Sequence, residues 1–170
     1  DTVPPSGSMV INNGADFTRS LTVTLALSGQ DATSGVTDMR FSLDSGVTWT
    51  AWETFANAKF LELTSGNGPK EVYFQLKDRA GLISTAYLDT IVLDTTPPAF
   101  TITSPLPFST VSEQGFLIQG TASDIHAQVS AIRLLLYDYG RRTFTINNQL
   151  ANYYPSSGTW AFQVLPSHIT

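Results

Sequence analysis

Apolar and polar residues alternate along much of this chain, in short runs separated by Gly, Asn, Asp, Ser and Pro. In the clearest run, residues 21–27, Leu or Val at each odd position alternates with Thr or Ala. This period of two is typical of a strand with one buried face. No run repeats apolar residues at helical spacing over a useful length, so we predict an all-β chain.

The first half of the chain contains about seven such strands, separated by turn sequences about every 8–12 residues. This number and spacing are typical of an immunoglobulin-like β-sandwich. Besides residues 21–27, the predicted strands are 9–11, 39–43, 47–52, 60–63, 72–76 and 85–93.

A repeat divides the chain. Asp-Thr-Val-Pro-Pro at residues 1–5 has a near copy, Asp-Thr-Thr-Pro-Pro, at 94–98. The spacing of 93 positions is close to the ~100 residues of one immunoglobulin-type sandwich. The same spacing relates Leu25 to Ile118 and Asp31 to Asp124. We therefore predict two tandem immunoglobulin-like β-sandwich modules, residues 1–96 and 97–170.

The second module has fewer predicted strands than the first. The repeat loses its register beyond residue 134, and residues 159–164 then resemble 60–63 in pattern. No counterpart of the last two strands of the first module follows before Thr170. Three explanations stay open: the chain is a fragment of a longer protein, the module is a smaller sandwich, or another chain supplies a strand by donor-strand complementation or self-assembly.

The paired prolines Pro97 and Pro98 predict a short, extended and stiff junction between the modules. Proline fixes φ and lacks the N–H group that would continue a strand ladder. Proline-rich linkers extend by ~3.1 Å per residue and act as semi-rigid spacers. The copy at residues 1–5 leads us to expect a further module before it in a parent chain.

Three sequences resemble those of bacterial immunoglobulin-like repeats: Asp-Thr-Thr-Pro-Pro at 94–98, Asp-Ala-Thr-Ser-Gly-Val at 31–36, and Lys-Asp-Arg-Ala-Gly-Leu-Ile-Ser at 77–84. The resemblance is good over residues 1–98 and weaker beyond them. Such repeats occur in large secreted and surface-attached bacterial proteins. The resemblance implies an extracellular or bacterial cell-surface location, with neighbouring repeats as partners. Leu82 departs from the family, which commonly has Asn there.

Composition excludes several classes of partner. The net charge is −5, and Arg141-Arg142 is the only basic pair, whereas nucleic-acid binding requires clustered basic residues. No apolar run approaches the ~18 residues of a membrane helix. The chain has no cysteine, which excludes disulfides and thiolate chemistry. We expect no nucleic-acid partner and no membrane insertion.

Candidate catalytic residues are few and scattered. His126 and His168 are the only histidines, and no Gly-x-Ser-x-Gly sequence occurs. Glycosidases need two carboxylates about 5–9.5 Å apart in a cleft, but the four glutamates are spread along the chain. We predict a protein that is not an enzyme and has no catalytic residues or organic cofactor.

Loop aspartates are candidate calcium ligands. Asp31 and Asp78 lie in predicted turns of the first module, and Asp94 lies at its exit. Calcium takes about 6–8 hard oxygen ligands, and loops at the end of a module can converge to supply them. The competing explanation is that each carboxylate closes its own turn through an Asx-type hydrogen bond.

Aromatic residues are the candidates for binding a glycan or protein ligand. Trp49 and Trp52 are three positions apart, which on a strand places them on opposite faces, with one ring in the core. Trp52, Tyr153 and Tyr154 are the candidate surface aromatics, the tyrosines because they lie in an irregular loop. Core packing is the competing explanation for the tryptophans.

The sequence thus favours a non-catalytic structural or spacer module of a bacterial extracellular or cell-surface protein. The alternative is a glycan- or protein-binding adhesin module, or an accessory module of an extracellular hydrolase. A binding module exposes a clustered aromatic or apolar patch, whereas a spacer does not.

Overall fold

The computed structural model describes residues 1–169, so Thr170, the expected end of the second module, lies outside the described residues. The chain divides into two compact units, of which unit 1 comprises Asp1–Thr95 and unit 2 begins at Thr96. Helical structure in the described residues is confined to two 3-10 helices, η1 (Asn12–Gly14) and η2 (Pro166–His168). None of it is long or apolar enough to cross a membrane.

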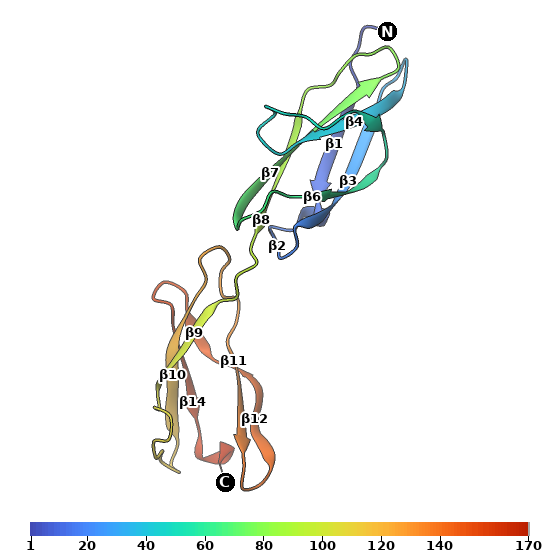
Figure 1. The fold of residues 1–170 in the computed structure, drawn as a ribbon. Coiled ribbons are helices and arrows are strands. Elements are labelled where there is room, and N and C mark those ends of the chain that lie inside the picture. The colour runs from blue at the N-terminus through green and yellow to red at the C-terminus, as the bar shows by residue number, and fades with distance from the viewer. Residues whose placement is uncertain (170) are drawn as a thin grey trace. The chain divides into compact units, whose positions relative to one another are not determined.

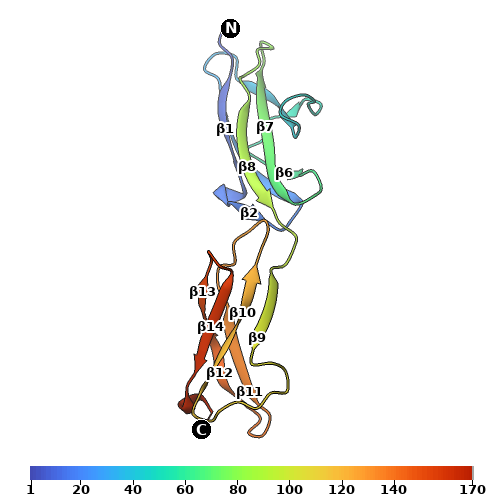
Figure 2. The same cartoon turned by 90° about the vertical axis from the view of Figure 1, so that its left-hand side faces the viewer.

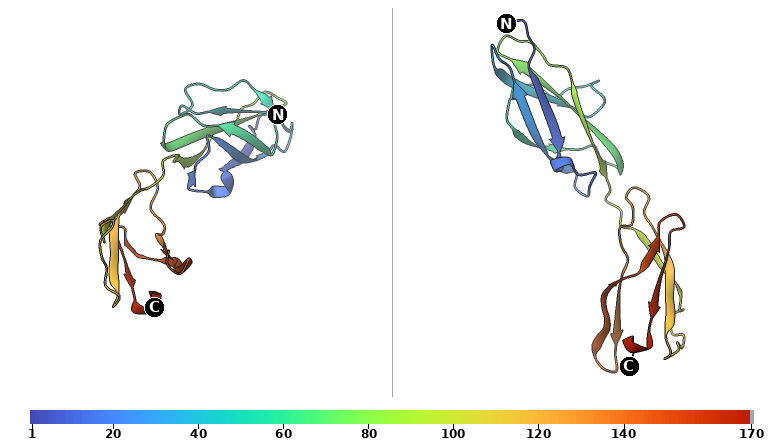
Figure 3. Two further views of the ribbon diagram at one scale, coloured as in Figure 1. Left: turned by 60° about the horizontal axis from the view of Figure 1, so that its bottom comes forward. Right: turned by 180° about the vertical axis from the view of Figure 1, so that it is seen from behind.

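Unit 1 is a sandwich of two sheets (Figure 1). The smaller sheet has the order β1 (Ser6–Ile11), β3 (Thr22–Gln30) and β6 (Ala58–Glu62). The larger sheet has the order β2 (Phe17–Thr18), β8 (Tyr87–Leu93), β7 (Gly68–Asp78), β4 (Val36–Ser42) and β5 (Glu53–Thr54). Seen from behind, β1 and β3 are the adjacent blue strands (Figure 3, right).

The core of unit 1 follows from the alternation in its strands. Val23, Leu25 and Leu27 on β3 are buried, while Thr24 and Ala26 between them are exposed. On β7, Phe74 is buried and stacks on Phe41 of β4, with ring centroids 5.5 Å apart. The period-two pattern therefore selects the face of each strand that meets the opposite sheet.

Unit 2 also has two sheets. Figure 2 shows one of them, with the order β13 (Asn152–Tyr154), β14 (Thr159–Val164), β10 (Phe116–Ser123) and β9 (Ala99–Ser104). The other is a hairpin of β11 (Arg133–Asp138) and β12 (Thr143–Leu150). Trp160, Ile146 and Val164 are the most deeply buried residues of its core.

The repeat seen in the sequence corresponds to equivalent strands. β9 lies 93 positions after β1, and β10 lies at the same spacing after β3 apart from one residue at its start. β11 overlaps the position expected from β4. Within the described part of unit 2, no strand follows β14, so β7 and β8 have no counterpart there.

The predicted strand at 47–52 is wrong. Residues 47–52 form a loop, and the short strand β5 begins only at Glu53. A loop does not alternate its side chains, so Trp49 and Trp52 are both partly exposed and neither lies in the core of unit 1. The buried tryptophan of the chain is Trp160 on β14, which stacks on Phe100 at 5.2 Å.

Candidate metal centre

Three aspartates meet at one end of unit 1. Asp1, Asp31 and Asp78 each offer a carboxylate oxygen, and these three oxygens lie within 4.8 Å of one another. Strand register explains the convergence. Ser6 at the start of β1 pairs with Gln30 at the end of β3, and Asp78 at the end of β7 pairs with Val36 at the start of β4.

Asp31 is held by its own turn. One of its oxygens, Oδ1, accepts hydrogen bonds from the backbone N–H groups of Ser34 and Gly35, each at 2.7 Å, and of Thr33 at 3.2 Å. These bonds lower the pKa of Asp31, the bond from Gly35 having the largest effect. The chain can close this turn because Gly35 has a φ of 79°, which glycine adopts without strain. Asp31 is therefore ionised at neutral pH.

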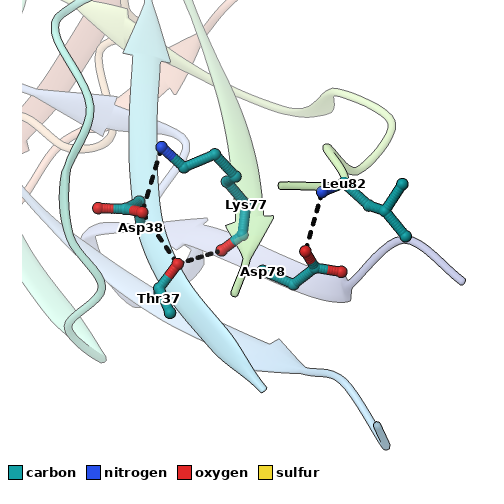
Figure 4. Close-up of polar contacts among 5 residues, drawn as sticks. All are labelled: Thr37, Asp38, Lys77, Asp78 and Leu82. Atoms are coloured by element: carbon teal, nitrogen blue, oxygen red, sulfur yellow. Dashed lines mark hydrogen bonds and ion pairs between the residues drawn. The ribbon is translucent and has the colours of Figure 1, made fainter. Parts of the chain in front are cut away.

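Asp78 is buried at the end of β7. Its Oδ1 accepts a hydrogen bond from the backbone N–H of Leu82 at 2.8 Å (Figure 4). Its Oδ2 is also buried but has no hydrogen-bond partner, and the residue is only 1% exposed. Because an unpaired buried carboxylate oxygen is costly, a group that binds it is expected there.

Asp1 completes the cluster from the N-terminal segment. Its Oδ2 accepts a hydrogen bond from the Ser34 hydroxyl at 2.7 Å, and its Oδ1 accepts one from the backbone N–H of Val3 at 2.9 Å. Ser34 belongs to the turn that Asp31 closes, so the same turn positions two of the three carboxylates. The N-terminus and the turn after β7 lie at the same end of unit 1 (Figure 2).

This arrangement fits a hard cation. Calcium binds oxygen ligands at 2.3–2.6 Å, so ligands on opposite sides of one ion are about 4.6–5.2 Å apart. Three carboxylate oxygens within 4.8 Å of one another can therefore share one ion. The turn-closing role and the metal-binding role are compatible, because each of Asp31 and Asp78 closes its turn through Oδ1.

The structure brings Asp31 and Asp78 together but places Asp94 elsewhere. The Asp94 carboxylate lies 3.4 Å from the side-chain amide of Asn67, the residue before β7, whereas Asp78 ends β7. Because an 11-residue strand spans about 35 Å, Asp94 and Asp78 lie at opposite ends of β7. Asp1 was not predicted to belong to this cluster. The sequence did offer a signal for it, because Asp1 shortly precedes β1, and β1 pairs with β3, the strand that ends directly before Asp31.

Trp52 is stacked against cations. The Arg40 guanidinium lies 4.4 Å from the centre of its ring and the Lys77 ammonium 4.6 Å from it. Arg40 also lies 4.7 Å from the Trp49 ring, so the two tryptophans enclose one side chain. Lys77 is further held by Asp38 at 3.2 Å (Figure 4). These contacts occupy ring surface that a sugar would need.

The two candidate tyrosines point in different directions from β13. Tyr153 is half-buried against the core of unit 2, and its hydroxyl donates to the Ala122 carbonyl at 3.3 Å. Tyr154 is exposed and lines a shallow pocket with Thr121 and Thr159. They do not form one aromatic platform.

The histidines and glutamates lie in separate places. His168 accepts a hydrogen bond from the Leu165 backbone N–H through Nδ1, and the backbone N–H of His126 donates to Asp124. Glu53 pairs with Lys59 at 2.7 Å. The three other glutamates lie on β6, on β7 and before β10, namely Glu62, Glu71 and Glu113.

Comparisons with known proteins identify the fold. Neither protein-family models nor curated protein sequences match this chain. The fibronectin(III)-like modules of CbhA from Clostridium thermocellum align over 91% of this chain and 77% of theirs, with a TM-score of 0.52 and 12% identity. At this identity the likeness concerns the fold alone, and it confirms the predicted immunoglobulin-like β-sandwich.

Two further structures align less closely. The PKD1 domain of Epp from Vibrio anguillarum matches 56% of this chain and 100% of that domain, with a TM-score of 0.41 and 14% identity. Chitinase ChiA74 from Bacillus thuringiensis matches 96% of this chain and 24% of its own, with a TM-score of 0.42 and 16% identity.

Proposed function

We propose that this chain is a non-catalytic structural module of a bacterial extracellular or cell-surface protein, where it acts as a spacer in a row of similar sandwiches. The immunoglobulin-like fold and the repeated junction sequence support this role. The scattered histidines and glutamates described above favour a module without an active site.

We further propose that Asp1, Asp31 and Asp78 bind calcium. The observation that carries this proposal is the buried, unpartnered Oδ2 of Asp78 within a cluster of three carboxylates. A divalent ion would offset the repulsion between these charges and connect the N-terminal segment to two turns of unit 1. Calcium would thereby stiffen the end of unit 1 through which the chain enters, which suits a spacer.

Thermal unfolding with and without calcium tests this site. A ligand present at 100 times its Kd stabilises the folded state by about 2.7 kcal/mol. We therefore expect millimolar calcium to raise the unfolding midpoint of unit 1 above its value in EDTA, and to do so more than magnesium.

The variant Asp78→Asn should abolish most of this shift, because it removes a charged ligand from the cluster. Its matched control is Asp44→Asn, which alters a different Asx turn of unit 1 and should leave the calcium shift intact. Equal midpoints in calcium and EDTA for the unaltered chain would contradict the proposed site.

A second candidate function is ligand binding by an adhesin or accessory module. It is favoured by three exposed rings on the β11–β12 hairpin, where Tyr137 lies edge-on at 5.0 Å to both Tyr139 and Phe144. Exposed rings of this kind can stack on a sugar face. Glycan-array binding that is lost in Tyr139→Ala would support this function, and an array without signal would oppose it.

A further inference from the structure

The β11–β12 hairpin (Figure 1) has an exposed aromatic and apolar face. Tyr137 on β11 pairs with Phe144 on β12, and their rings meet edge-on at 5.0 Å. Tyr139, in the turn that follows β11, is 87% exposed, and its ring lies 5.0 Å from that of Tyr137. Leu135 is also exposed, and it lies on the same face as Tyr137 because the two are two positions apart on one strand. This face therefore presents three rings that lie outside the core of unit 2.

The arginines of unit 2 all lie on this hairpin. Residues 96–170 contain three arginines, no lysine and three acidic residues, so their formal net charge is zero, and residues 1–95 carry the whole net charge of −5. The arginines are Arg133, Arg141 and Arg142, whereas Asp138 is the one acidic residue between positions 133 and 150. The hairpin is therefore a positively charged segment of an acidic chain.

The turn of the hairpin holds two of these arginines close to the rings. Asp138 closes this turn, because its Oδ1 accepts hydrogen bonds from the backbone N–H groups of Gly140 at 2.8 Å and Arg141 at 3.0 Å. Its Oδ2 lies 3.7 Å from the Nε of Arg141. Arg142 is exposed and precedes Phe144 by two residues, which is at most about 7 Å along the chain. Asp138 is therefore directed to Arg141 and its own turn, while Arg142 faces solvent beside the rings.

We propose that the outer face of the β11–β12 hairpin binds an acidic polysaccharide. The apolar face of a sugar ring would stack on Tyr139 or Phe144, and a sugar carboxylate would pair with Arg142. Arginine suits this role because its planar guanidinium can donate two parallel hydrogen bonds to one carboxylate. The proposal rests on the second candidate function, ligand binding by this hairpin, and it names the class of ligand. It is independent of the calcium site.

Charge distinguishes this ligand from a neutral glycan and from nucleic acid. A neutral glycan needs the rings but draws no benefit from the charge of the arginines beside them. Nucleic acid carries a phosphate at every nucleotide and is bound by larger basic surfaces, whereas unit 1 adds only negative charge to this chain. A polymer of uronic acids has a carboxylate on each sugar ring, which matches a few arginines placed among aromatic rings.

Calorimetric titration of the 170-residue chain with two matched polymers tests the proposal. The first polymer is polygalacturonate. The second is the same polymer with its carboxylates methyl-esterified, which keeps the sugar rings and removes their charge. We expect the chain to bind polygalacturonate at least about tenfold more tightly, because hydrogen bonds to charged groups are the stronger ones. Added salt should weaken this binding, since it screens exposed charges.

Three variants locate the binding residues. Arg142→Gln should weaken polygalacturonate binding about tenfold, because it removes charge-assisted hydrogen bonds, and should not change binding of the esterified polymer. Arg19→Gln is the matched control, because Arg19 is an exposed arginine of unit 1, and it should have no effect. Tyr139→Ala should abolish binding of both polymers. All three side chains are exposed, so the unfolding midpoints should stay close to that of the unaltered chain.

Three results would overturn the proposal. One is equal affinity for the two polymers that Arg142→Gln does not reduce, which would leave the second candidate function in place with a neutral glycan as ligand. Another is equal or tighter binding of single-stranded DNA, which would assign the hairpin to nucleic acid or to charge alone. The last is a chain that binds neither polymer. If a glycan array also gives no signal in that case, the second candidate function fails together with this proposal.

Discussion

At the scale of single residues, the two oxygens of one carboxylate can have different structural roles. In Asp31 and Asp78, Oδ1 closes a turn, and each carboxylate also contributes to the acidic cluster. Turn chemistry can be read from a short sequence, which is why both residues were predicted. Asp1 could not be found in this way, because its position depends on a pairing between strands that are distant in sequence.

The Asp44 turn predicts a pH dependence. The pKa of Asp44 is lowered from 3.8 to about 2, mainly because the Thr48 hydroxyl donates to Oδ2. A carboxylate whose pKa is lower in the folded state than in the unfolded state stabilises the folded protein at pH values above the unfolded-state pKa. This stabilisation is lost as the pH falls through the folded-state pKa. The unfolding midpoint of unit 1 should therefore fall between pH 3.8 and about 2.

Asp44→Asn should reduce this fall, and Thr48→Val, which removes the main donor, should act in the same direction. The measurement is thermal unfolding by circular dichroism across this pH range. Curves that run parallel for all three proteins would show that the turn contributes nothing to acid sensitivity.

We predict that the Trp52 side chain stabilises the folded state of unit 1. Trp52→Ala removes ring contacts with Arg40 and Lys77, and cation–π contacts contribute about 0.5–2 kcal/mol each. We expect the free energy of unfolding to fall by about 1–3 kcal/mol in urea titrations. Trp52→Phe should lose less, since it keeps a ring. A loss of glycan binding without any loss of stability would contradict this assignment.

At the scale of elements, alternation predicted the strands that have one buried face. The run at 72–76 lies within β7, and the runs at 21–27 and 85–93 lie on β3 and β8 except for residue 21 and residues 85–86, because their apolar residues meet the opposite sheet. Residues 47–52 failed because their tryptophans are fixed by Arg40 rather than by a pleated sheet. Contacts between an aromatic ring and a cation do not produce a regular alternation of apolar and polar residues in the sequence.

β7 is the central strand of the larger sheet of unit 1, and its buried side chains should contribute most to the stability of that unit. Phe74→Ala should cost about 3–5 kcal/mol, because it removes a fully buried ring from a close-packed site. Phe60→Ala is the control, since Phe60 is 74% exposed on β6 and should change stability by about 0.5 kcal/mol or less. Urea unfolding measures both, and similar losses for the two would contradict the assigned core.

At the scale of the whole molecule, the two units have cores of different size. Among the described residues, twelve buried residues form the core cluster of unit 1 and seven form that of unit 2. The division into two modules could be read from the repeated junction sequence. The residues that form the core of unit 2 could not be predicted in this way, because the sequence pattern does not show which strands pack over each apolar residue.

Calorimetry should therefore show two unfolding transitions, with unit 2 melting at the lower temperature. Phe74→Ala should shift only the transition of unit 1, and Val164→Ala only that of unit 2, because each residue belongs to one core. A single transition that both variants shift equally would mean that the units unfold as one cooperative body.

The position of Asp1 has a practical consequence for dissecting proteins of this kind. A cloning boundary drawn at Pro4 and Pro5, where the sequence looks like a linker, would delete a carboxylate that hydrogen-bonds to Ser34 and belongs to the acidic cluster. An affinity tag or protease scar fused at that point would also crowd the cluster. A recombinant form of unit 1 should therefore keep Asp1, or its measured cation affinity will describe the cloning junction rather than the protein.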